Sequence, residues 1–431
     1  MKQVIIVAAQ FPPSNWTAGH RCRYFAMHLP KFGWKVKVLS VEPSYYEEEL
    51  DNELVQLLPP DLEIIRTRAF PVRPLRIIGD ISVRAFGWHY SALCRLIKQE
   101  KIDLIYIPIP PNYSALLGPL IYRRFGIPYC LDYIDPWVHP WPGCEILFSK
   151  AWVSYRLSRI LEPYVLKYVS LITAVGPGYY QGALERYPWL DISRCMAIPY
   201  GAEEKDFQYL DGHPRQTYLF DSCDGNLHIV YAGAMLPRAY PVLEALLQAA
   251  LLLRADYPTL AQKLKFHFIG TGSHPADPDS FTVKPLVQRW GLLDNFSETP
   301  KRIPYLDVLN HLKNAHAVLL LGSTEPHYTP SKVFQAVLSR RPVIALLNAK
   351  STAVGILREA NVGATVTFDE ARPVDKCVDE IARLVYNVAQ YGSLSQELNL
   401  TAFAEYSAEA MARRLARAFD AVLGNNKKSN R

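Results

Sequence analysis

The chain has 431 residues, of which 49% are hydrophobic and 20% charged; this length predicts two domains, and the composition is that of a globular protein rather than a disordered one. Its formal net charge of +6 is small for this length and accompanies no recognised nucleic-acid-binding module, so we expect no nucleic-acid partner. The seven cysteines are scattered and include no CxxC pair, which argues against a disulfide framework or zinc knuckle and favours a reducing, cytoplasmic compartment.

The first apolar run, Val4–Ala9, predicts a buried strand. It ends too early for a signal peptide, and no run in the sequence approaches the roughly 20 residues that span a bilayer. Gly19 and Arg21 follow this strand at the start of a helical segment, where a glycine permits close backbone approach and a helix start favours anions. The segment is not a GxGxxG fingerprint, so an ordinary tight turn is the alternative.

The rest of the first half alternates short apolar runs with longer segments of helical periodicity. This alternation is typical of βαβ units and predicts a parallel sheet. The predicted strands are 36–41, 104–107, 127–131, 171–175 and 196–198, and the predicted helices are 21–32, 82–99, 113–125 and 155–169.

Two segments of the first half combine basic and aromatic residues. Residues 66–101 contain eight Lys and Arg interleaved with aromatic residues, and residues 150–168 repeat this composition. Such segments suit peripheral contact with an anionic membrane surface. The alternative is a pair of helices whose aromatic residues are core and whose basic residues face water.

Asp132 and Asp135 lie three residues apart at the end of the predicted strand 127–131. Carboxylates at a strand end could hold a sugar hydroxyl or act as a general base, and His139 nearby could titrate near neutral pH. Capping of a neighbouring helix is the alternative for either carboxylate.

The strand and helix pattern restarts after an irregular, polar segment at 202–225, which we interpret as a linker. We therefore predict two tandem, doubly wound, Rossmann-like α/β domains that face a central cleft, over residues 1–205 and 206–406. A last helix, 407–423, is expected to pack back on the first domain. Ligands of open α/β sheets lie beyond the carboxyl ends of the strands, so the cleft is the expected site. The predicted strands of this half are 226–232, 265–269, 317–321 and 343–347, and the predicted helices are 242–254, 285–290, 331–339 and 353–360.

Gly233 and Arg238 follow the first strand of the second domain, where the glycine permits backbone approach and the arginine could clamp a diphosphate. The chain contains no GxxxxGK[ST], so an ATP-hydrolysing P-loop is not supported. Asp277 and Asp279 formally match the DxD pattern of metal–diphosphate sites but follow no strand, and we expect no metal.

The segment from Thr329 to Leu346 has the clearest binding signal. Thr329 is expected to cap a helix that begins at Pro330, and Lys332 lies beside the exposed N–H groups of its first turn. A helix start with an adjacent lysine suits a phosphate group. An ordinary strand–helix–strand unit with a solvated lysine is the alternative.

Five segments in order resemble the retaining glycosyltransferases of family 4, which have the GT-B fold. The resemblance extends from the first strand to about residue 370. The matching segments are 11–13 with Gly19, Arg21 and 29–36; 132–137; 198–203 with Phe207; 231–233 with Arg238; and 330–335 with 342–343.

The resemblance implies that the second domain binds a nucleotide-diphosphate sugar and the first binds a hydroxyl acceptor, such as a lipid-linked sugar or surface polysaccharide precursor. Arg238 and Lys332 would neutralise the diphosphate leaving group, Asp135 would act on the acceptor side, and no metal or other cofactor would be required. The other expected substrate contacts are Gly19, Arg21, Asp132, His139, Gly233, Glu325, His327, Ser331 and Gln335.

Three positions depart from the family pattern. Gln335 replaces the usual glutamate that holds the ribose hydroxyls, Ile134 replaces an arginine or histidine, and Tyr200 replaces an asparagine. A catalytically decayed sugar-nucleotide-binding protein therefore stays open as an alternative, as does an epimerase or hydrolase of a sugar nucleotide.

Overall fold

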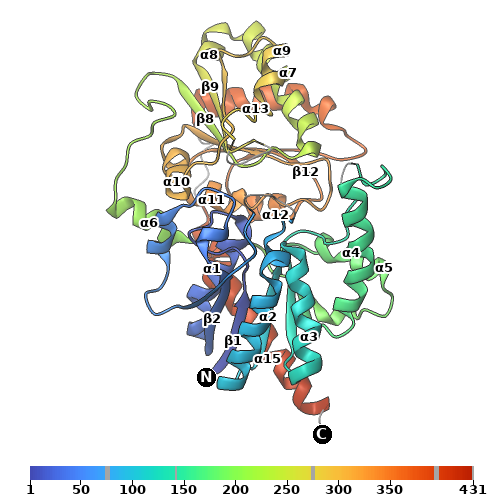
Figure 1. The fold of residues 1–431 in the computed structure, drawn as a ribbon. Helices are drawn as coiled ribbons and strands as arrows, with labels where there is room; N and C mark the ends of the chain where they lie inside the picture. Colours follow the sequence, from blue (N-terminus) through green and yellow to red (C-terminus); the bar gives the residue numbers. More distant parts are fainter. Residues whose placement is uncertain (73–77, 141–142, 273–276, 393–397, 430–431) are drawn as a thin grey trace. The chain divides into compact units, whose positions relative to one another are not determined.

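The computed structural model describes residues 1–72, 78–140, 143–272, 277–392 and 398–429. The chain divides into two compact units, one formed by Met1–Gly201 with Ala408–Arg431 and the other by Ala202–Ser407. Each unit is a parallel sheet with helices on both faces (Figure 1). The prediction of two doubly wound α/β domains is confirmed, although residues 202–205 belong to the second unit.

The sheet of the first unit has seven strands in the order β3-β2-β1-β4-β5-β6-β7. β3 was not predicted from the sequence because it is a partly buried edge strand with only two apolar residues, Ile64 and Ile65, whereas the central strands are continuously apolar. The strands are β1 (Lys2–Val7), β2 (Trp34–Val41), β3 (Glu63–Thr67), β4 (Leu104–Ile109), β5 (Tyr129–Tyr133), β6 (Leu171–Ala174) and β7 (Cys195–Ala197).

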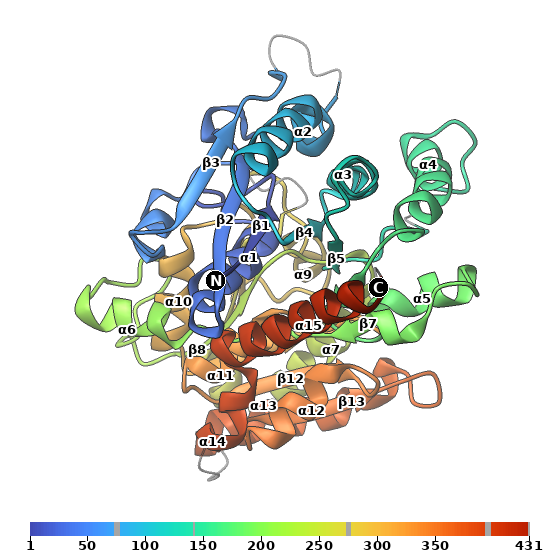
Figure 2. The same ribbon diagram turned by 90° about the horizontal axis from the view of Figure 1, so that it is seen from below.

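Helices cover both faces of this first sheet. One face packs against α1 (Thr17–His28) and α15 (Ala408–Ser429), and Figure 2 shows α15 in red on the α1 side of the strands. The Phe419 ring of α15 lies 5.2 Å from the Trp34 ring and 5.5 Å from the Tyr106 ring, so the end of the chain completes this core. The opposite face packs against α2 (Ile81–Gln99), α3 (Leu117–Phe125), α4 (Lys150–Leu166) and α5 (Gly178–Arg186).

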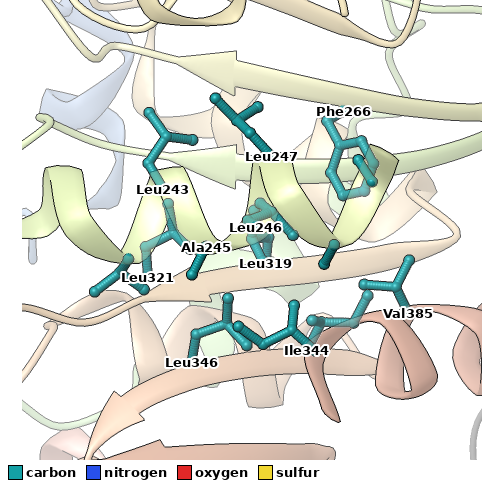
Figure 3. Packing of buried hydrophobic residues seen from close by; sticks show 14 of the residues in the cluster. Leu243, Ala245, Leu246, Leu247, Phe266, Leu319, Leu321, Ile344, Leu346 and Val385 are labelled. Carbon is teal, nitrogen blue, oxygen red and sulfur yellow. The ribbon is translucent and has the colours of Figure 1, made fainter. Parts of the chain in front are cut away.

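The second sheet has six strands in the order β10-β9-β8-β11-β12-β13. Figure 3 shows leucines of α7 packed against β11, β12 and α13, so one face of the sheet carries a continuous aliphatic core. The strands are β8 (Leu227–Ala232), β9 (Leu264–Ile269), β10 (Phe296–Thr299), β11 (Ala317–Leu321), β12 (Val343–Asn348) and β13 (Ala364–Phe368).

The helices of the second unit include one inside the segment predicted to be an irregular linker. This helix, α6 (Glu204–Gly212), buries Phe207 and Leu210. The others are α7 (Tyr240–Asp256), α8 (Pro258–Lys263), α9 (Lys284–Arg289), α10 (Tyr305–Asn314), α11 (Lys332–Leu338), α12 (Thr352–Glu359), α13 (Val378–Tyr391) and α14 (Leu400–Phe403). Short 3-10 turns in the two units are η1 (Leu29–Phe32), η2 (Pro43–Tyr45), η3 (Asn52–Leu57), η4 (Asn112–Leu116), η5 (Ile192–Arg194), η6 (Pro237–Ala239), η7 (Val374–Cys377) and η8 (Ala404–Tyr406).

Both sheets change winding direction at one point. In the first unit this switch lies between β1 and β4, and in the second between β8 and β11. The loops that leave two such strands diverge to opposite faces and open a crevice at the carboxyl edge, where ligands of open α/β sheets bind. Within the described part of the chain, no helix is both long and apolar enough to cross a membrane.

Candidate functional site

Lys332 and Gly233 come together at the switch point of the second unit. Gly233 directly follows β8, and Lys332 follows the loop that leaves β11. A Cβ atom built on Gly233 would lie 1.8 Å from Cε and 2.2 Å from Nζ of Lys332, and the φ angle of Gly233 is 133°. The lysine side chain therefore lies against bare backbone, and glycine is required here both for its conformation and for the room it leaves.

Among the residues that the structure describes, the Lys332 ammonium group has no neutralising partner. The side chain is partly buried, and Nζ lies 5.2 Å from the centre of the Tyr231 ring. Burial, and to a smaller extent the charge of Arg302, lowers the pKa of Lys332 to about 8. No carboxylate of the described residues forms an ion pair with it. A desolvated cation beside a second cation favours an anionic ligand.

Arg302 was not identified from the sequence. It follows β10, and its Cγ would lie 3.7 Å from a Cβ built on Gly270, which follows β9 with a φ of 69°. The available signal was the basic pair Lys301–Arg302, but β10 contains a single large apolar residue and gave no strand prediction. Only the folded sheet brings the exits of β9 and β10 beside the switch point.

Arg238 and Glu325 link the two loops at the same switch point. Arg238 lies in η6 after β8, and its Nε is 3.5 Å from Oε1 of Glu325 in the loop after β11. The Thr324 N–H also donates to the Arg238 carbonyl oxygen at 3.0 Å. The Arg238 side chain is 61% exposed, so this ion pair is weak and the guanidinium group can turn to a ligand. His327 and Ser331 lie in this second loop, both partly buried.

The predicted start of the helix at this site is wrong. α11 begins at Lys332, and its N-cap residue, Ser331, makes no side-chain capping hydrogen bond. Thr329 instead places its hydroxyl 2.7 Å from that of Thr352 in α12. Because α11 has only seven residues, the charge of Lys332 would attract an anion more strongly than the helix dipole would.

Gln335 lies one turn into α11 with an unsatisfied acceptor. Its Oε1 is buried and has no hydrogen-bond partner among the described residues. An unpaired buried acceptor costs on the order of 1–3 kcal/mol. Such an atom is suited to accept a hydrogen bond from a ligand hydroxyl.

Arg21 and Asp132 form a buried ion pair in the first unit. Arg21 Nε and Nη2 donate to the two carboxylate oxygens of Asp132 at 2.6 and 2.9 Å, and neither side chain is exposed. The Thr173 hydroxyl donates to Asp132 at 2.7 Å, and Arg21 Nη1 donates to the Pro199 carbonyl at 2.8 Å. We therefore correct both predictions: these side chains hold α1, β5 and the turn at Pro199 together and have no surface for a substrate.

The other residues predicted to form a site in the first unit are Asp135, His139 and Gly19. Asp135 is exposed just after β5, and His139 is partly buried four residues later. Ile134 is only 3% exposed, so this departure from the family pattern is a core position. Gly19 is buried in α1, and a Cβ there would make an ordinary contact of 3.4 Å with the Gln10 carbonyl oxygen, so local geometry does not require glycine.

The described residues contain no group of three or more His, Cys, Asp and Glu side chains that could hold a metal ion. The DxD-like pair forms a local turn, in which the Asp279 N–H donates to Asp277 Oδ1 at 2.9 Å. Asp277 and Asp279 are thus part of one local Asx turn.

A histidine cluster secures the segment between α6 and β8. The Phe220 ring stacks on His228 and His267 at 4.6 and 4.9 Å, and a nitrogen of each imidazole approaches the other at 2.9 Å. His311 Nε2 accepts hydrogen bonds from the Tyr218 and Leu219 N–H groups, both at 3.3 Å. His311 accepts these two hydrogen bonds only as a neutral imidazole, because a protonated ring cannot accept hydrogen bonds.

We expect the second unit to lose stability in mild acid. Burial and the neighbouring His228 lower the pKa of His267 in the folded unit to about 4. In the unfolded chain the pKa of this histidine is about 6.5, so between pH 6.5 and 4 the unfolded chain binds a proton that the folded unit does not. The stabilising contribution is therefore complete above pH 6.5 and decreases as the pH falls towards 4, by on the order of 3 kcal/mol. Calorimetric melting across this range should show a shallower pH dependence for His267→Gln than for the wild type. The exposed His213 is the control, and an equal slope for His213→Gln and His267→Gln would contradict the assignment.

No protein family model matches this sequence, and no curated protein sequence matches it. Solved structures do match over nearly the full length of the chain. A glycosyltransferase from Rickettsia africae has a TM-score of 0.60 and 14% identity, covering 98% of this chain and 99% of that one. HepE from Anabaena in complex with UDP and glucose has a TM-score of 0.59 and 14% identity, covering 98% of this chain and 100% of that one. An α,α-trehalose-phosphate synthase (UDP-forming) from Burkholderia vietnamiensis has a TM-score of 0.65 and 11% identity, covering 99% of this chain and 100% of that one. The chain thus has the fold of GT-B glycosyltransferases.

Proposed function

We propose that this protein is a glycosyltransferase that moves a sugar from a nucleotide-diphosphate sugar to a hydroxyl acceptor. The observation that carries the proposal is the partly buried Lys332 at the switch point of the second unit, with its lowered pKa and no ion-pair partner among the described residues. A diphosphate supplies the negative charge that this position lacks. HepE, which shares the fold, has been solved with UDP and with UDP-glucose, which makes a uridine donor the first to test.

The proposed reaction is metal-independent and retains the anomeric configuration, as in family 4. The bond between the anomeric carbon and the diphosphate oxygen breaks, and Lys332 and Arg238 stabilise the charge that develops on the leaving group. The acceptor hydroxyl attacks from the leaving-group face, and its proton passes to the diphosphate oxygen.

The donor's other contacts follow from the loops of the second unit. The unpaired Gln335 Oε1 would accept a hydrogen bond from a ribose hydroxyl, and Ser331 would contact the diphosphate. Glu325 and His327 are proposed to contact the donor sugar. Asp135 and His139, in the first unit, are proposed for the acceptor side.

The acceptor is proposed to be a lipid-linked sugar or a surface polysaccharide precursor, met at the cytoplasmic face of a membrane. All seven cysteines are free thiols, which supports a reducing compartment. An exposed apolar and basic surface on the first unit supports an acceptor presented by lipid.

The first test is a thermal-shift screen with UDP-, GDP-, ADP- and TDP-sugars, with and without EDTA. We expect one nucleotide class to stabilise the protein in EDTA, because a ligand at 100 times its Kd adds about 2.7 kcal/mol to the stability of the folded state. Release of the nucleoside diphosphate should then require a hydroxyl acceptor. Release without an acceptor would instead indicate a hydrolase, and stabilisation without release under any condition would indicate a binding protein.

A further inference from the structure

Helix α4 of the first unit is oriented with an apolar face towards solvent. Val153, Leu157 and Ile160 are exposed at the i, i+4 and i+7 spacing that places side chains on one face of a helix. The opposite, buried face includes Ser158 and Glu162, and the Glu162 carboxylate accepts a hydrogen bond from Arg186 at 2.7 Å. Val165 and Leu166, near the end of the helix, are also buried, so α4 packs on the core through its last turns. The apolar residues Val153, Leu157 and Ile160 form a second apolar face, which a surface helix usually lacks.

The loop before α4 extends this apolar surface. Ile146, Leu147 and Phe148 are 61%, 63% and 78% exposed. The loop is ordered by its own hydrogen bonds, since the Ile146 N–H and the Ser149 hydroxyl both donate to the Gly143 carbonyl oxygen, at 3.2 and 2.7 Å. Three consecutive large apolar side chains are thus held outward by a defined backbone, which marks an interaction site.

The charges around this surface are almost all positive. Lys150, Arg156 and Arg159 are exposed on α4, and Lys167 follows its end. The acidic residues of the segment are the exposed Glu145 and the buried, paired Glu162. Arg156 and Arg159 also lie 5.4 and 5.9 Å from the rings of Trp152 and Tyr155, so their guanidinium groups border aromatic residues. Exposed apolar side chains within a cationic rim are complementary to anionic lipid.

We propose that this α4 surface, made of Ile146–Phe148 with Val153, Leu157 and Ile160, docks on an anionic lipid bilayer. The loop residues and the apolar stripe enter the boundary between headgroups and acyl chains, and the basic residues contact the phosphates. This inference goes beyond the proposed transferase activity and would hold for any function of the second unit.

A second copy of the chain is a poorer occupant than lipid. In a two-fold symmetric dimer the same patch faces itself, so Lys150, Arg156 and Arg159 would approach their own copies, and like charges across an interface repel. Bilayer phosphates instead neutralise all three, and no partner of matching shape is needed for side chains that project from a loop and one helix face.

In the described part of the other basic segment, 66–101, several of the aromatic and basic residues are engaged within the first unit. Phe86 and Tyr90 pack against the core of the first unit. Arg84 is 2% exposed and donates to the Phe70 carbonyl oxygen at 2.9 Å, and Arg66 donates to the Val41 carbonyl oxygen at 3.1 Å. Arg73 and Arg76 lie outside the described residues. The docking proposal therefore rests on α4 and its preceding loop.

Co-sedimentation of the full chain with vesicles tests the proposal. The wild type should pellet with vesicles of phosphatidylcholine and phosphatidylglycerol, and much less with phosphatidylcholine alone. Leu147→Ser with Ile160→Ser should reduce partitioning to the anionic vesicles by at least about tenfold, because both side chains leave water on docking. Arg156→Gln with Arg159→Gln should remove most of the preference for anionic vesicles and its dependence on salt.

Ile192→Ser is the matched control, because Ile192 is 66% exposed in the same unit and Ile160 is 69% exposed. Failure of the wild type to bind either vesicle, or equal losses for Ile160→Ser and Ile192→Ser, would overturn the proposal. So would concentration-dependent dimerisation, measured by sedimentation equilibrium, that the Leu147 and Ile160 substitutions abolish. Nucleotide binding of the same variants is measured separately, and it should be unchanged, so failure of docking and failure of the proposed donor site give different results.

Discussion

Replacing Lys332 with methionine is expected to weaken nucleoside diphosphate binding by roughly 10- to 100-fold, the size of a lost charge-assisted hydrogen bond. Methionine preserves the unbranched side chain that packs beside Gly233 and Tyr231 but removes the positive charge. The rate of sugar transfer should fall further, by about 100- to 1000-fold, because the diphosphate gains negative charge in the transition state. Isothermal titration with UDP, followed by steady-state kinetics with the best donor, measures both effects.

The pH dependence of binding identifies the lysine more specifically. Because the pKa of Lys332 is lowered to about 8 in the free protein, the ammonium group is charged below that pH and progressively neutral above it. An anionic ligand binds the charged form better, so wild-type affinity for UDP should decrease as the pH rises from 7 to 9.5, by up to about tenfold per pH unit above 8. Lys332→Met should be flat over this range, and Lys332→Arg should bind throughout, because its guanidinium stays charged.

Lys263→Met is the control for a lost lysine charge. Lys263 is exposed at the end of α8, directly before β9. It therefore lies at the amino-terminal ends of the strands of this sheet, whereas Lys332 lies at their carboxyl ends. Equal UDP affinity for Lys332→Met and wild type, or the same change in Lys263→Met, would show that the switch-point lysine does not contact the ligand. The proposed donor site would then be wrong.

Gly233→Ala is expected to weaken nucleotide binding about as much as loss of the lysine charge does, by roughly 10- to 100-fold, although it adds a single methyl group. The new Cβ would lie 1.8 Å from Lys332 Cε, so the lysine must leave its position. The φ angle of 133° is also unfavourable for alanine, which adds a stability loss on the order of 1–3 kcal/mol. Titration with UDP and thermal melting separate the binding effect from the stability effect.

A double-mutant cycle distinguishes displacement of the lysine from general damage. In the Lys332→Ala background the atoms that obstruct the methyl group are gone, so Gly233→Ala should cause no further loss of affinity. Gly355→Ala is the control glycine, since nothing lies within 4 Å of a Cβ built there. Additive losses of binding from the two substitutions would mean that Gly233 acts independently of Lys332.

The sequence correctly predicted those elements whose pattern is contained within one short segment of the chain. Continuous apolar runs predicted the central strands, since buried parallel strands are apolar on both faces. It failed at the edge strand β3, whose apolar content is lower, and at α6, which was interpreted as linker because its polar residues and following glycine suggested a turn. The order of motifs suggested the loops of the candidate site before their geometry was known.

The roles of charged residues could not be predicted in the same way, because burial depends on partners distant in sequence. Arg21 looked like a ligand-binding residue beside a glycine, yet it pairs with Asp132 inside the first unit, 111 positions away. Glu162 and Arg186 similarly bury a charge that periodicity would leave in water. Composition alone could not separate the exposed basic residues of α4 from the internally bonded arginines of residues 66–101.

The sequence by itself determined the α/β class, the two-domain plan and the chemical identity of the loop residues after β8 and β11. Local propensity and hydrophobic periodicity act over a few residues, and these features depend on little else. Only the tertiary structure decided that Lys332 lies against Gly233 near Arg302, that Arg21 and Asp132 are structural, and that α4 presents an apolar face to solvent. The first depends on parallel strand pairing, which brings loops separated by many residues to one edge of a sheet. The other two depend on how α1 and α4 pack against the first sheet.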